Sequence, residues 1–151
     1  MKRINTIMIM ILLVCFAGSI KAQSIRWADT NEEYARKIGD NLYEPVPAGV
    51  VSYKVENNKF FLLANGELEG QKGHLSRKGD IAYYFNGEDQ MVGYYKSKDK
   101  VQRYTIVEPG SGKEDECAVL YEGTLYLFGK VKYKVDDSFS PDVLGFFLFV
   151  H

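Results

Sequence analysis

A histidine and a nearby serine are the first candidates for chemistry in this sequence. His74, one of two histidines, is followed two residues later by Ser76. On a strand, residues two apart share a face, so these two side chains would lie next to each other. A serine hydrolase also needs an orienting acid, and no nucleophile elbow surrounds Ser76. We therefore expect no catalytic residue, and keep a small hydrolase centred on His74 as an alternative.

Carboxylates offer two weaker signals. Glu67 and Glu69 would share a strand face, as the paired acids of glycoside hydrolases do across a cleft. Asp136, Asp137 and Asp142 could hold calcium in a loop, but their spacing matches no EF-hand pattern. We interpret both groups as exposed charge, and expect no metal and no cofactor.

Cysteine is scarce, and this excludes a disulfide framework. Cys15 lies in the apolar N-terminal segment, which we expect to be removed as a signal peptide. The chain that remains would keep Cys117 as its one cysteine. Cys117 begins an apolar run and follows three acidic residues, which would raise its pKa. We expect a buried small side chain rather than a reactive thiol.

Residues 1–22 have the pattern of a secretory signal peptide. A basic start at Lys2 and Arg3 precedes an apolar run, and Ala22 stands before the expected cleavage. We therefore predict export to the periplasm or surface of a bacterium, and a single β-rich domain over residues 23–151 with no transmembrane segment.

Lipidation at Cys15 is a less favoured alternative to this cleavage. A bacterial lipoprotein signal has a small residue just before the cysteine, whereas this chain has Val14 there.

Without residues 1–22 the chain would carry 16 basic and 20 acidic residues, a net charge of −4. This charge argues against a nucleic-acid partner, because phosphates demand a basic surface.

Alternating apolar and polar residues predict strands through most of the chain. Turn dipeptides such as Asn65-Gly66 and Asn86-Gly87 separate these runs. The expected strands cover residues 49–55, 59–64, 67–76, 80–85, 90–96, 101–107, 117–121, 124–128, 130–135 and 144–150.

A single helix is expected within the segment 25–38, and residues 29–38 are expected to form it. Asp29 or Thr30 would cap it, acids follow in its first turn, and Gly39 ends it. The expected fold is therefore all-β and mainly antiparallel: one barrel or sandwich of about 8–10 strands, with one short N-terminal helix. A small outer-membrane barrel also fits the apolar final strand, but several strands are shorter than such a barrel needs.

One stretch resembles a known repeat. Residues 79–87, with Tyr83-Tyr84 before Asn86-Gly87, lead to Tyr94-Tyr95, and this resembles the hairpin units of MORN-type repeats over about 35 residues. The resemblance fades after Lys96 and does not assign the chain to that family. It implies a protein-interaction surface made of hairpins.

Aromatic residues exceed what one inner layer of a small sheet needs. The chain has 11 Tyr and 9 Phe, and several strands are apolar on both faces. Tyrosine-rich faces recur at binding surfaces. We take Tyr83, Tyr84, Tyr94, Tyr95 and Trp27 as candidate binding residues.

The function that these patterns favour is an exported, non-enzymatic binding module. Its partner would be a protein or a glycan at the cell envelope. The main alternative is a carrier of a small apolar ligand, which predicts an enclosed apolar cavity of several hundred Å³ inside the barrel.

Overall fold

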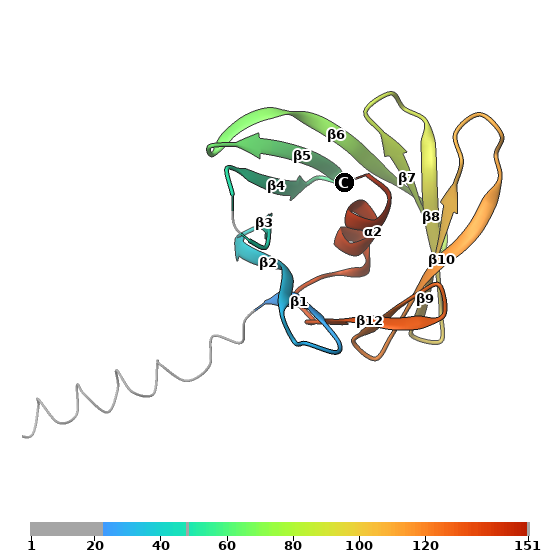
Figure 1. The fold of residues 1–151 in the computed structure, drawn as a ribbon. Coiled ribbons are helices and arrows are strands. Elements are labelled where there is room, and N and C mark those ends of the chain that lie inside the picture. Colours follow the sequence, from blue (N-terminus) through green and yellow to red (C-terminus); the bar gives the residue numbers. More distant parts are fainter. Residues whose placement is uncertain (1–22, 48, 151) are drawn as a thin grey trace, which may run out of the picture.

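The chain folds into a closed antiparallel β-barrel. The computed structural model describes residues 23–47 and 49–150, apart from the side chains of Val131 and Lys132. Twelve strands follow one another around the wall, and β1 pairs with β12 to close it (Figure 1). The expected all-β antiparallel class is confirmed, and the architecture is a barrel of twelve strands rather than 8–10.

The strands differ in length, and the longest is on the wall opposite the closure. They are β1 (Ser24–Trp27), β2 (Glu33–Gly39), β3 (Leu42–Pro45), β4 (Val51–Glu56), β5 (Lys59–Ala64), β6 (Glu67–Lys78), β7 (Ile81–Asn86), β8 (Met91–Lys98), β9 (Val101–Val107), β10 (Glu114–Tyr121), β11 (Thr124–Leu127) and β12 (Lys130–Val135).

The up-and-down order gives the barrel two ends. The turns after the even-numbered strands β2 to β10 lie at one end, together with segment 136–140, which leads from β12 into the helix. We call this the helix-entry end. The expected turn at Asn65-Gly66 lies at the opposite end, where both residues have positive φ (51° and 78°), as a two-residue hairpin turn requires.

Helix α2 (Pro141–Phe149) lies in the lumen of the barrel (Figure 1). Ser140 caps it by accepting a hydrogen bond from the backbone N–H of Val143 at 3.3 Å, and Pro141 stands in its first turn. The helix sequence is apolar on nearly every side. Such a helix is stable only where apolar groups surround it, as they do inside this barrel.

Aromatic rings from several strands pack around the helix. The ring of Phe146 stacks on Phe60 (centroids 5.1 Å apart) and meets the edge of Tyr84 (5.1 Å). Phe147 contacts Tyr43 and Tyr53 on the neighbouring wall. The helix therefore supplies the centre of the core, and the barrel wall supplies its outer layer.

Three glycines let the helix approach the wall closely. A Cβ at Gly93 would lie 2.6 Å from the ring of Phe149, and one at Gly73 would meet Val150 at 2.8 Å. A Cβ at Gly145 would overlap the ring and hydroxyl of Tyr84. Larger residues at these positions would force the helix away from the wall.

Polar groups of the wall hold the start of the helix. The Tyr95 hydroxyl donates to Asp142 Oδ1 at 2.6 Å, and Arg77 donates to the same oxygen. The Tyr104 hydroxyl donates to the carbonyl of Pro141 at 2.9 Å, and the Tyr84 hydroxyl to that of Asp142 at 3.0 Å. These bonds satisfy three buried phenol groups and fix where the helix enters the lumen.

The helix expected over residues 29–38 is wrong. This segment instead forms the turn between β1 and β2, with Asn31 at a φ of 60°, and most of β2. Along β2, buried Ala35 lies between exposed Tyr34 and exposed Arg36, which is the alternation of a strand. Pairing with β1 and β3 overrides the helix-like order of charges.

The strand expected over residues 144–150 is also wrong, because these residues form most of α2. The other expected strands are present with shifts of a few residues at some ends, whereas β1, β2 and β3 were not expected.

The signal peptide expected over residues 1–22, including Cys15, lies outside the described residues. Within the ranges that the structure describes, no helix combines the length and apolar character needed to cross a membrane.

Candidate functional site

The four candidate tyrosines of β7 and β8 divide between the two faces of the wall. Tyr83 pairs with Tyr94, and their rings lie 5.9 Å apart on the outer face, half-buried. Tyr84 and Tyr95 point into the lumen and are 0% and 4% exposed. The outer pair is open to a partner, whereas the inner pair belongs to the core.

Burial changes the acidity of the inner tyrosines. Desolvation raises the pKa of Tyr84 far above its usual value, and that of Tyr104 likewise. Desolvation, together with the hydrogen bond to Asp142, raises the pKa of Tyr95 to about 12. These phenols therefore stay protonated and act as hydrogen-bond donors to the helix.

Trp27 lies on the opposite side of the barrel from the tyrosine pair. β1 and β7 are separated by the same number of strands in either direction around the wall. The indole packs against Tyr133 (centroids 4.7 Å apart) and Tyr34 (6.4 Å), beside the closure between β1 and β12. One compact site therefore cannot include both Trp27 and the pair Tyr83–Tyr94.

The outer wall around the tyrosine pair also carries lysines and an arginine. Lys78 pairs with Ile81, Ile81 with Lys96, and Lys96 with Arg103, so these residues form one row across β6 to β9. The tyrosine pair forms the adjacent row, and Lys98 lies two residues beyond Lys96 on β8. We call this surface, with Tyr83, Tyr94, Lys78, Lys96, Lys98 and Arg103, the β6–β9 face.

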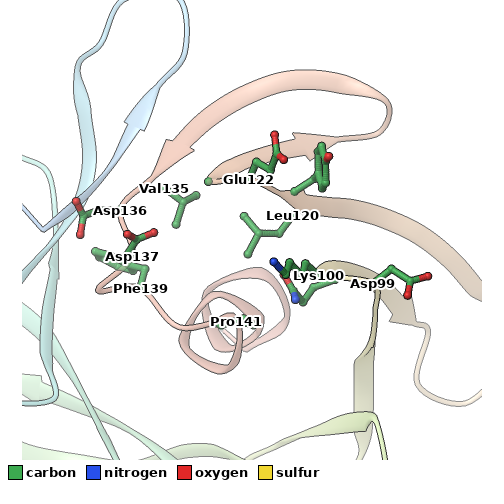
Figure 2. A pocket seen from close by; sticks show the side chains of 12 residues that line it. Asp99, Lys100, Leu120, Glu122, Val135, Asp136, Asp137, Phe139 and Pro141 are labelled. Atoms are coloured by element: carbon green, nitrogen blue, oxygen red, sulfur yellow. The ribbon is translucent and has the colours of Figure 1, made fainter.

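A cavity with a volume of about 380 Å³ lies at the helix-entry end (Figure 2). Its apolar floor includes Leu120, Val135, Phe139 and Pro141. Its polar groups come from two turns, from the start of β9 and from the segment before the helix: Asp99, Lys100, Gln102, Glu122, Asp136 and Asp137. Acidic side chains thus outnumber basic ones in this cavity. The cavity itself was not predicted, because the residues that line it are distant from one another in the sequence.

A smaller apolar cavity lies between the helix and the wall near the closure. It has a volume of about 80 Å³ and is lined by residues that include Ile25, Leu125, Leu144 and Leu148. This volume is well below the several hundred Å³ that the carrier alternative predicts, because α2 fills the lumen.

His74 lies on the outer wall, away from both cavities. Its ring stacks on Phe85 with centroids 4.8 Å apart, and its Nδ1 is 3.6 Å from the carboxylate of Asp89. Ser76 lies two residues along on the same strand and is exposed. The histidine therefore has an acid nearby, and it is not among the residues that line either of the two cavities described above.

The other candidate chemical groups do not converge. Asp142 pairs with Arg77 and Tyr95 at the start of α2, and is not among the cavity residues that include Asp136 and Asp137. In the part of the chain that the structure describes, no three His, Cys, Asp or Glu side chains are placed to hold a metal ion.

Cys117 is a buried thiol, as expected. It is 7% exposed, and its Sγ donates to the Tyr104 carbonyl at 3.5 Å. Desolvation raises its pKa, which leaves little thiolate at neutral pH.

Comparison of the chain with protein-family models, curated proteins and solved structures finds no match. The resemblance to MORN-type repeats therefore has no support from a family model.

Proposed function

We propose that this protein is an exported, non-enzymatic binding module whose β6–β9 face contacts a protein or glycan partner at the cell envelope. The observation that carries this proposal is the outward position of Tyr83 and Tyr94, whose rings lie 5.9 Å apart. Such a pair offers a large, rigid contact area at a small cost in side-chain entropy.

The filled lumen supports an outer binding surface. Phe146 and Leu144 of α2 are 0% and 1% exposed, so the interior has no room for a large ligand. The inner tyrosines are used in packing and in holding the helix. The outer tyrosines do not hold the helix: Tyr94 instead donates a hydrogen bond to Glu114 on the outer wall at 3.0 Å.

The test is a comparison of wild type with the double variant Tyr83→Ser/Tyr94→Ser. Both mature proteins are screened by biolayer interferometry against defined glycans and purified envelope proteins. We expect the double variant to lose at least about tenfold in affinity, because exposed tyrosines at interface centres carry a large share of binding energy. Its melting temperature should stay within a few degrees of wild type, because both rings lie on the outer face.

The matched control is Phe128→Ser. Phe128 is 75% exposed and lies in the turn after β11, away from the β6–β9 face. Equal affinity of wild type and the tyrosine double variant for every bound partner would refute the proposal, as would an equal loss in the Phe128 variant.

A second candidate function is the binding of a small molecule in the cavity at the helix-entry end. Its volume of about 380 Å³ is within the range of small-molecule sites. This candidate predicts that ligand contacts gather on Leu120 and Phe139 rather than on the tyrosine pair.

A further inference from the structure

The row of basic residues on the β6–β9 face is continuous across the wall. Lys96 and Arg103 are direct partners on adjacent strands, and Lys78 is two strands away in the same row. With about 4.8 Å between neighbouring strands, the row extends over about 14 Å. Lys98 adds a further charge beside it, on the same face of β8 as Lys96.

Several lysines of the wall, including the three of this face, form no ion pair with an acidic side chain that the structure describes, whereas other basic residues are paired. On β1 to β4, Arg26 pairs with Glu33, Arg36 with Glu44 and Lys54 with Glu56. Among the side chains that the structure describes, none forms an ion pair with the three lysines of the β6–β9 face. Arg103 is the exception, because its guanidinium lies 3.2 Å from Glu116.

Some acidic residues border this face and limit its charge. Asp80 and Asp99 lie in the turns beyond the row, and Glu114 and Glu116 lie on β10. Glu114 accepts a hydrogen bond from the Tyr94 hydroxyl at 3.0 Å, and Glu116 pairs with Arg103. Lys78, Lys96 and Lys98 therefore leave positive charge on β6 and β8, in a chain whose formal net charge is −1.

Aromatic rings and ammonium groups meet directly on this face. Lys96 Nζ lies 5.5 Å from the centroid of the Tyr94 ring, which is itself paired with Tyr83. Protein–protein interface centres are depleted in lysine. Lysines without acidic partners beside half-exposed rings fit an extended anionic chain better than they fit another folded protein.

We propose that the β6–β9 face binds an acidic polysaccharide. The sugar rings lie with their C–H faces against Tyr83 and Tyr94, and the carboxylate or sulfate groups contact Lys78, Lys96 and Lys98. This inference rests on the proposed binding function and narrows its partner from a protein or glycan to an anionic glycan.

The test uses dextran sulfate and polygalacturonate as acidic polymers and dextran as the uncharged match. Affinity gel electrophoresis of the mature protein should show retardation by both acidic polymers and little by dextran. Because surface charges are screened by salt, affinity should fall at least about tenfold between about 50 mM and about 500 mM NaCl.

Two triple variants identify the residues responsible. Lys78→Gln/Lys96→Gln/Lys98→Gln should lose at least about tenfold in affinity for dextran sulfate, while its melting temperature stays close to wild type. Lys54→Gln/Lys113→Gln/Lys130→Gln removes the same charge from other parts of the surface and should keep the wild-type affinity.

Four results would overturn the inference. Equal losses in both triple variants would show attraction by overall charge alone. Equal retardation by dextran would show a neutral glycan site, which contradicts the anionic partner but leaves the proposed function intact. Equally tight binding of single-stranded DNA through the same lysines would identify a general polyanion surface. If no polysaccharide binds but a protein partner still binds through Tyr83 and Tyr94, the glycan inference is refuted and the proposed binding function stands. If neither a polysaccharide nor a protein binds through these residues, the inference and the proposed function are both refuted.

Discussion

Single residues set the distance between the helix and the wall. Gly145 faces Tyr84, which is fully buried and held by a hydrogen bond to the Asp142 carbonyl at 3.0 Å. Its ring also packs against Phe146 and Phe149. The closeness of this contact makes position 145 sensitive to a single added methyl group.

Gly145→Ala should therefore destabilise the protein. The added Cβ overlaps the Tyr84 ring, and overpacking of this kind costs about 1–3 kcal/mol. Urea unfolding at neutral pH measures the loss. Gly70→Ala is the matched control, because a Cβ at Gly70 has no atom within 4 Å. An unchanged midpoint for Gly145→Ala would contradict the packing of α2 against Tyr84.

The buried phenols predict sensitivity to alkali. Burial raises the pKa of Tyr84 and Tyr104 well above 10, and that of Tyr95 to about 12. Above about pH 10 the unfolded chain loses phenolic protons that the folded barrel keeps, so unfolding becomes more favourable as pH rises. Each such tyrosine lowers the free energy of unfolding by about 1.4 kcal/mol per pH unit in this window.

Urea unfolding between pH 8 and pH 12 measures this slope. Tyr104→Phe should be less stable at pH 8, because it loses the hydrogen bond to Pro141, and should show a shallower decline above pH 10. Phe128→Leu, which changes an exposed aromatic residue and removes no titrating group, serves as the control and should keep the wild-type slope. A wild-type stability that is flat up to pH 12 would contradict the burial of these phenols.

The sequence predicted that neighbouring tyrosines point to opposite faces of the wall. It did not predict which tyrosines face the lumen and which face outward. Tyr83-Tyr84 and Tyr94-Tyr95 must point to opposite sides of a strand, and they do. Which side faces the lumen depends on Gly145 and Asp142, far along the chain, because these residues receive the inner rings.

At the scale of elements, α2 is the structural centre of the barrel. Phe146 contacts Phe60 on β5 and Tyr84 on β7, while Leu144 and Leu148 face the small cavity near the closure. The helix thus links the wall on both sides and takes the place of a second sheet as cover for the inner face.

Phe146→Ala should be among the most destabilising substitutions in the helix. Removal of a fully buried ring leaves a cavity and costs about 3–5 kcal/mol. Leu148→Ala should cost less, because Leu148 is partly exposed and already lines a cavity. Equal losses in chemical denaturation would contradict the central position of Phe146.

The errors at this scale have identifiable causes. Residues 144–150 are apolar on all sides, and such a run fits a buried strand as well as a buried helix. Ser140 and Pro141 form a helix-start signal that favours the helix, and they do cap it. For residues 29–38, charge order and a possible cap suggested a helix, but Ala35 packs inward from a strand whose pairing partners lie outside this segment.

At the scale of the whole molecule, closure of the barrel joins distant parts of the chain. Ile25 pairs with Val135 and Trp27 with Tyr133, and no local pattern predicts such long-range pairing. The class of fold was predictable because turn residues and alternation are local, whereas the number of strands, the closure and the cavity at the helix-entry end were not.

A closed wall and an occupied lumen leave the outer face and the two ends of the barrel as surfaces for a partner. The β6–β9 face combines paired tyrosines with lysines that have no acidic partner among the described side chains, whereas the cavity is mostly acidic. The two surfaces therefore favour ligands of opposite charge, which makes them distinguishable by one experiment.

The most direct measurement is a chemical-shift map of the ¹⁵N-labelled mature protein titrated with a sulfated dextran oligosaccharide. The shifted amides should gather on β6 to β9 around Tyr83, Tyr94 and Lys96, with those of Leu120 and Phe139 unchanged. Shifts that instead gather on the cavity residues, or around Trp27 on the opposite wall, would contradict the proposed role of the β6–β9 face.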